Sequence, residues 1–183
     1  MKARRQAAAL EPLILKPLRG LSKDDWHRAP DGRWTIAQIV SHVAQGVDLV
    51  AAKLEERAAR TDMARRATPR QHLMRHLVLG VGRIPAGRKT PAATRPPERP
   101  DPTLVTAQYR MAVERLAGFV EKWPADQQGR VYVQHPVLGD LNLPEWVRFF
   151  YVHGRHHAHQ IAVRLRWLHR QERRKPRRRG RKP

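Results

Sequence analysis

Four of the ten histidines in this sequence lie within seven residues, at His153, His156, His157 and His159. His153 and His157 are four residues apart, so on an α-helix their side chains lie one turn apart and about 40° apart around the axis. This spacing allows two imidazoles on one helix to bind the same metal ion. The alternative interpretation is a basic helix surface that continues into the arginine-rich C-terminus.

A third histidine, His42, lies in a segment with helical apolar periodicity, between Ile39 and Val43 on one face. We therefore expect its side chain to face the protein interior. A single inward histidine is more often a hydrogen-bonded core residue than a ligand. Together with the His153–His157 pair, however, it provides three imidazoles. Three protein ligands with further coordination positions left open are typical of a catalytic metal site, not of a closed structural one.

The other histidines have weaker patterns. His156 lies within about 60° of His153 around the helix, so it is either a further ligand or a residue that supports the ligands. His159 points away from the pair and is expected at the surface. His135 precedes a proline in a predicted loop. It either lines the site or shapes the turn, and we favour the turn.

Composition excludes several other kinds of site. The chain has 183 residues and no cysteine, which rules out a thiolate metal site, a catalytic cysteine and a disulfide scaffold. The length fits one domain with a sizeable core. No run approaches the roughly 18 apolar residues of a membrane span, and the N-terminus does not read as a signal peptide. We therefore expect a cytoplasmic protein with no membrane contact.

The charge is concentrated at one end. The formal net charge is +21, and residues 164–183 contain eleven Lys or Arg but a single acid, Glu172. Residues 171–183 are expected to be disordered, because basic residues, proline and glycine cannot build a core. Arg177, Arg178 and Arg179 are candidates for weak, nonspecific contact with nucleic acid through its phosphates. The alternative is a solvated tail.

Helical periodicity dominates the rest of the chain. Apolar residues recur at helical spacing in four segments, at about residues 7–21, 35–60, 103–123 and 144–170. A capping-box pattern precedes the second segment, and an Asp-Pro pair precedes the third. Residues 69–81 read as a short helix and residues 84–102, with six prolines, as a long loop. We predict an all-α domain, a four-helix bundle over residues 1–170.

One strand-like run stands apart from these helices. Residues 131–133 read Val-Tyr-Val, and we expect His135-Pro136 and Gly139-Asp140 to end the run at once.

Three motifs resemble those of one family. Residues 33–43, RWTIAQIVSHV, resemble the W-S/T-…-H-L motif of the DinB/YfiT-like superfamily, with the usual spacing from Trp34 to His42. Residues 153–161, HGRHHAHQI, resemble its H-x-x-x-H-x-x-Q-I motif. Residues 135–146, HPVLGDLNLPEW, are similar to the H-P-x-x-G-x-L-…-E-W lead-in of one branch. Because the three motifs occur in this order and spacing, the sequence is identified as a member of this superfamily over roughly residues 5–170.

The resemblance implies a four-helix bundle with up-down-down-up topology. It also implies a divalent metal held by three histidines that correspond to His42, His153 and His157. We expect zinc or nickel, with manganese or iron as the alternatives. Four further residues are expected to pack around the ligands or support them. These are Trp34, His135, His156 and Gln160.

Relatives include transferases that use a low-molecular-weight thiol (bacillithiol, mycothiol or glutathione) and a maleylpyruvate isomerase, and many are homodimers. We therefore expect a metal-dependent thiol S-transferase or hydrolase, which activates a thiol or water for attack on a small-molecule electrophile. The alternative is a non-catalytic metal-binding or interaction bundle whose arginine-rich tail contacts nucleic acid. Ala158-His159 replaces the usual Arg-Gly, and the 84–102 insertion is long. Both departures leave the choice of substrate open.

Overall fold

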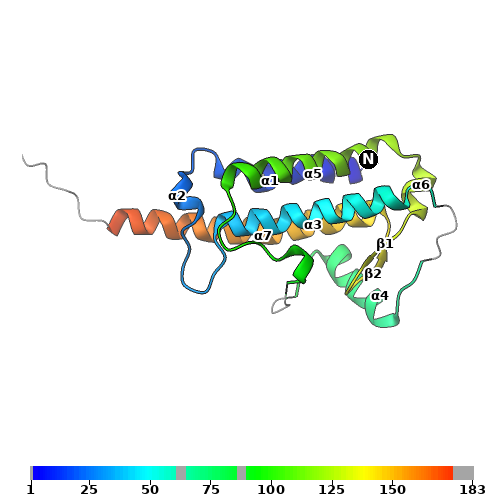
Figure 1. Ribbon diagram of the computed structural model, residues 1–183. Coiled ribbons are helices and arrows are strands. Elements are labelled where there is room, and N and C mark those ends of the chain that lie inside the picture. The colour runs from blue at the N-terminus through cyan, green and yellow to red at the C-terminus, as the bar shows by residue number, and fades with distance from the viewer. Residues whose placement is uncertain (1, 61–64, 86–89, 175–183) are drawn as a thin grey trace, which may run out of the picture.

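Four long helices form a bundle in the computed structural model, which describes residues 2–60, 65–85 and 90–174 (Figure 1). They are α1 (Lys2–Leu15), α3 (Ile36–Arg57), α5 (Pro102–Lys122) and α7 (Leu143–Arg174). α1 and α3 each pack against both α5 and α7. In Figure 1, α3 and α5 run in one direction, whereas α1 and α7 run in the other. The fold is therefore the predicted four-helix bundle, and its topology is up-down-down-up.

Shorter elements connect the long helices. η1 (Lys16–Leu18) and α2 (Lys23–Trp26) join α1 to α3. α4 (Pro69–Arg75), the π-helical η2 (His76–Val81) and η3 (Ala92–Thr94) lie between α3 and α5. α6 (Ala125–Arg130), β1 (Val133–His135) and β2 (Gly139–Leu141) lie between α5 and α7. Because α3 and α5 are parallel neighbours, the chain between them must return along the bundle, and on this path η3 packs against α3.

Local sequence signals fix the starts of α3 and α5. The Thr35 hydroxyl accepts a hydrogen bond from Gln38 N at 3.2 Å, and Gln38 Oε1 accepts one from Thr35 N at 3.0 Å. These reciprocal bonds are the predicted capping box. At the start of α5, Asp101 accepts a hydrogen bond from Leu104 N at 2.9 Å, and Pro102 occupies the first turn. At each helix start, one of the N–H groups that lack a partner within the helix is thereby satisfied.

The first and last long helices, α1 and α7, begin or end at residues other than those expected from the sequence. α1 begins at Lys2 and ends at Leu15, so Pro12 lies inside the helix and Pro17 lies in the following 3₁₀ turn. α7 continues to Arg174, four residues past the expected end. Residues 171–174, which the sequence predicts to belong to the disordered tail, are therefore helical. Arg177, Arg178 and Arg179 lie outside the described residues.

The structure corrects the expected end of the strand-like run. β1 and β2 pair as an antiparallel hairpin in which Val133 lies opposite Leu141 and His135 lies opposite Gly139. Gly139 has a φ of 74°, which glycine adopts without strain. A Cβ atom there would lie 2.9 Å from Ala67 Cβ. β1 begins at the last residue of the expected run. Of the residues expected to break it, His135 is the last residue of β1, Pro136 lies in the turn, and Gly139 and Asp140 belong to β2.

Side chains from all four long helices meet in one apolar core. Leu10, Ile39, Leu116 and Ile161, one from each helix, are at most 1% exposed. The buried Tyr109 hydroxyl donates a hydrogen bond to the Leu10 carbonyl at 2.8 Å, which ties α5 to α1. Within the described ranges, none of the helices has the length and apolar character to cross a bilayer.

Candidate metal centre

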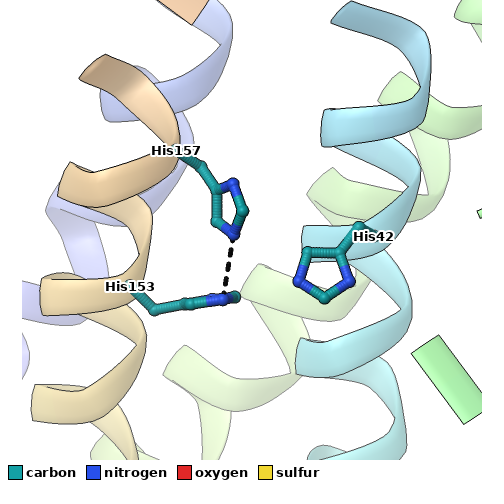
Figure 2. Close-up of side chains that lie close together, drawn as sticks. All are labelled: His42, His153 and His157. Carbon is teal, nitrogen blue, oxygen red and sulfur yellow. Dashed lines mark hydrogen bonds between the residues drawn. The ribbon is translucent and has the colours of Figure 1, made fainter. Parts of the chain in front are cut away.

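Three histidines converge between α3 and α7 (Figure 2). α3 provides His42, and α7 provides His153 and His157. One ring nitrogen from each lies within 4.8 Å of the other two. The Nε2 atoms of His153 and His157 are 2.9 Å apart. The ring centroid of His42 lies 5.3 Å from that of His153 and 5.0 Å from that of His157. The structure thus brings together the three residues that the sequence singled out as metal ligands.

The helix pairing explains this convergence. α3 and α7 are antiparallel neighbours, so a residue on the inner face of α3 faces inner positions of α7. The four-residue spacing stacks His153 and His157 on one face of α7. His42 and His157 are buried, with exposed fractions of 8% and 5%, whereas His153 is half-buried. Access to the cluster is therefore greatest beside His153.

Hydrogen bonds set the tautomers of two of these histidines. His42 Nδ1 lies 2.8 Å from the Thr94 carbonyl oxygen. Because a carbonyl can only accept, Nδ1 carries the proton and Nε2 keeps its lone pair. His157 Nδ1 lies 2.9 Å from Gln160 Oε1 and donates to it in the same way. Both imidazoles therefore present an unprotonated Nε2 to the space between the helices, which a metal ligand requires.

His153 is held differently. Its Nδ1 atom is buried without a hydrogen-bond partner, and its ring stacks on Phe149, with centroids 5.3 Å apart and planes at 14°. Packing therefore orients His153, whereas hydrogen bonds orient the other two.

These donors fit a divalent ion. A tetrahedral ion with 2.0–2.1 Å bonds places neighbouring ligand nitrogens about 3.3 Å apart. In this cluster the Nε2 atoms of His153 and His157 are 2.9 Å apart, and all three ligand nitrogens lie within 4.8 Å of one another.

All three imidazoles are neutral at neutral pH. Burial lowers the pKa of His157 to about 3, and repulsion from His42 adds to this effect, while the Gln160 hydrogen bond opposes it. Burial also lowers the pKa of His42, against the opposing effect of the Thr94 carbonyl. The pKa of His153 falls well below its ordinary value because of burial and of repulsion from His157 and His42. Only the neutral form can donate a lone pair to a metal.

Trp34 braces the site from the start of α3. Its ring lies 5.2 Å from the His42 ring, and its carbonyl oxygen accepts a hydrogen bond from Arg164 Nε at 2.9 Å. Arg164 is buried on α7, two turns beyond His157. This bond ties the N-terminal end of α3 to α7 near the cluster. Sequence analysis missed Arg164, because an arginine among many others carries no distinguishing pattern.

His135 shapes the hairpin turn, as favoured from the sequence. Its Nδ1 accepts hydrogen bonds from Val137 N at 3.0 Å and Leu138 N at 3.2 Å. The ring packs against Phe149, with centroids 4.7 Å apart, and Phe149 in turn stacks on His153. The hairpin therefore supports the cluster through an aromatic ring that the sequence did not identify.

His156 and His159 lie outside the cluster. Both are exposed. The Gln160 amide nitrogen donates to His156 Nε2 at 3.1 Å, so His156 holds the glutamine that orients His157. This is the supporting role that the sequence left open as an alternative to ligation.

Thr94 was also missed, since it acts through its backbone carbonyl and comes from the proline-rich loop. Gln38 holds this loop against α3 by donating to the Glu98 carbonyl at 3.0 Å.

A surface hollow lies between α7 and the segment that follows η2, and none of the three clustered histidines lines it. It has a volume of about 260 Å³ and is lined by Gly82, Arg83, Ile84, Val152, Arg155 and His156. No carboxylate lines it, and two guanidinium groups do. A larger hollow of about 440 Å³, between α3 and α5, includes none of the site residues and is lined by Glu55, Met111, Glu114, Arg115, Gly118, Phe119 and Lys122.

Comparisons with known proteins agree with this arrangement. The family model described as the DinB superfamily matches residues 5–161. A search of curated proteins finds no match. Among solved structures, the fold is similar to that of YfiT from Bacillus subtilis, with a TM-score of 0.62 and 15% identity over 91% of this chain and 86% of that one. YfiT is described as a probable metal-dependent hydrolase with an unusual four-helix bundle topology.

The lowered histidine pKa values predict a pH-dependent stability for the metal-stripped protein. The folded-state pKa of His157 is about 3, below the unfolded value of about 6.5. Below pH 6.5 the unfolded state therefore binds protons that the folded state does not. The free energy of unfolding should fall by up to about 1.4 kcal/mol per pH unit for this residue, from pH 6.5 toward 3.

Urea denaturation between pH 7 and pH 5 measures this slope. It should be shallower in His157→Asn and unchanged in His169→Asn, a variant of an exposed histidine on the same helix. Equal slopes in the two variants would contradict the assignment.

A second prediction concerns Gln160. Gln160→Leu removes the oxygen that orients His157, so metal affinity should fall by about 10- to 100-fold. Gln160→Glu keeps an acceptor oxygen and should retain most of the affinity. Competition with a chromophoric chelator measures both constants. Gln108→Leu, at an exposed position on α5, is the matched control. Wild-type affinity in Gln160→Leu would show that the hydrogen bond has no role in binding.

Proposed function

Because the chain belongs to the DinB superfamily, we propose that it is a metal-dependent enzyme that uses His42, His153 and His157 as ligands. One observation carries this proposal: three neutral imidazoles from two helices meet within 4.8 Å, and hydrogen bonds turn Nε2 of two of them into the shared space. Core histidines without a ligand have no need of such convergence, and burying three of them together destabilises the fold at low pH.

The donor set limits the metal. Imidazole nitrogens bind zinc, nickel and iron(II) well, whereas manganese prefers oxygen ligands. The absence of thiolate and carboxylate donors in the cluster favours zinc or nickel. When bound, such an ion supplies Lewis acidity, which lowers the pKa of a coordinated water or thiol toward neutrality.

The surrounding residues prepare the site for a small reactant. The Thr94 carbonyl orients His42 and Gln160 orients His157. The Trp34 ring packs against His42, and the Phe149 ring stacks on His153. His153 is the most accessible of the three, so we infer that the reactant approaches from its side. Arg83 and Arg155 line the hollow between α7 and the segment that follows η2, and no carboxylate lines it. Such a positively charged lining suits an anionic substrate or a thiol that carries carboxylates.

Two reactions are compatible with this chemistry. One is hydrolysis, in which water attacks a small electrophile, and the description of the structurally similar YfiT supports this alternative. The other is transfer of a low-molecular-weight thiol to such an electrophile. In both, the nucleophile gains reactivity at neutral pH by losing a proton more easily.

Metal content tests the ligand set. Protein purified without an affinity tag and equilibrated with zinc or nickel should hold about one ion per chain by elemental analysis. His153→Ala and His157→Ala should each lose it, because two imidazoles bind far more weakly than three. His159→Ala, at an exposed position on the same helix, should retain it. Stoichiometric metal that persists in both His153→Ala and His157→Ala would rule out this site.

Activity assays separate the two reactions. We expect the metal-loaded protein either to hydrolyse small anionic esters or amides, or to conjugate glutathione to an electrophilic aryl halide. His157→Ala should lose at least about 100-fold in kcat/KM for the supported reaction. Arg83→Gln should raise KM more than it lowers kcat, because Arg83 lies in the hollow and outside the cluster. An inactive protein that still binds metal would favour the non-catalytic alternative.

A further inference from the structure

The outer face of α7 carries six basic side chains, and the proposed reaction uses only Arg155 among them. Successive residues of an α-helix differ by 100°, so these six fall within a sector of about 100°. The first and last of them are 18 positions apart, which is a rise of about 27 Å along the helix. The six, here called the α7 stripe, are Arg155, His159, Arg166, His169, Arg170 and Arg173, and all are exposed.

Acidic side chains do not neutralise the stripe. Glu172 is the single acid after Glu145, and it lies about 100° from Arg173 around the helix. Among the described residues, no ion pair involves a residue after Glu145. Elsewhere arginines are paired, as Arg115 is with Asp48 and Glu55. The stripe therefore carries no negative side chain, and three of its four arginines lie between residues 166 and 173.

The opposite face of α7 holds the stripe rigidly. Leu168 is buried, the Arg28 guanidinium lies 5.8 Å from the Trp167 ring centroid, and Arg164 donates to the Trp34 carbonyl. Figure 1 shows that the C-terminal end of α7 projects past the other long helices. A partner can therefore approach the C-terminal part of the stripe without meeting the other long helices.

We propose that the α7 stripe binds the phosphate backbone of double-stranded nucleic acid. A duplex presents about one negative charge per 1.7 Å of its axis, so a straight basic stripe can meet several phosphates at once. Guanidinium groups, which are four of the six side chains, bind phosphate oxygens through two parallel hydrogen bonds. Six further Lys or Arg follow in residues 175–183, which extends the positive sequence beyond the helix.

The composition of the stripe argues against a membrane surface. A helix that lies in a lipid interface places large apolar side chains beside its cations. The exposed large apolar residues of the described chain are on other elements: Leu49, Leu73, Val81, Leu104 and Met111. Contacts to phosphates position a protein on a duplex without reading its sequence, so we expect the stripe to bind with little sequence specificity.

Fluorescence anisotropy with the full-length protein tests this surface. The probes are mixed-sequence DNA and RNA duplexes longer than the stripe, titrated from about 50 to 200 mM salt. The stripe variant combines Arg166→Gln, Arg170→Gln and Arg173→Gln, leaving Arg155 and the hollow intact. The matched control combines Arg4→Gln, Arg5→Gln and Lys16→Gln, three exposed cations near α1 with the same change of charge.

The stripe variant should weaken duplex binding by about tenfold or more at low salt. The slope of log K against log salt should become shallower by about 2.7, because each lost phosphate contact removes about 0.9. The control should remain within about twofold of wild type. DNA and RNA probes that depend equally on the stripe support backbone recognition, and the tighter probe identifies the partner.

Equal losses in the two variants would overturn the proposal in favour of general charge attraction, and no loss in the stripe variant would overturn it outright. Tighter binding to anionic phosphatidylglycerol vesicles than to either duplex would also overturn it. Far-UV circular dichroism and the thermal unfolding midpoint check that each variant is folded, independently of the proposed metal site.

Discussion

The neutrality of three buried imidazoles is the constraint on which the site depends. His42, His153 and His157 can share the space between α3 and α7 only while uncharged, since burial and mutual repulsion both oppose protonation. Neutral imidazoles must in turn have their tautomers fixed, which requires an acceptor at Nδ1. The structure provides such acceptors for His42 and His157, and aromatic packing for His153.

Topology and ligand orientation are connected through one segment. In an up-down-down-up bundle α3 and α5 run parallel, so the chain between them must return along the bundle. That return path passes beside α3 at η3, where the Thr94 carbonyl meets His42. The capping residue Gln38 also holds the loop, through its amide nitrogen. The proline-rich connection that the sequence marks as a simple loop is thus part of the site.

α7 carries both the histidine cluster and the α7 stripe, on opposite faces. Its inner face carries His153, His157 and the buried Arg164, while its outer face carries the α7 stripe. The separation follows from helical geometry, because residues three or four apart share a face and intermediate ones do not. The inner face is packed and its charged groups are few and bonded, whereas the outer face is solvated, so many cations can be accommodated there at little cost in stability.

The sequence by itself determined the four long helices, the starts of α3 and α5, and the candidate ligands. These depend on local patterns: apolar periodicity, capping residues and the four-residue histidine spacing. Tertiary structure alone decided that His42 faces the α7 pair, and it added the Thr94 carbonyl, Phe149 and Arg164. It also turned expected strand breakers into a hairpin. A backbone carbonyl or a distant aromatic ring has no local sequence signature, because its role exists only once remote segments are packed together.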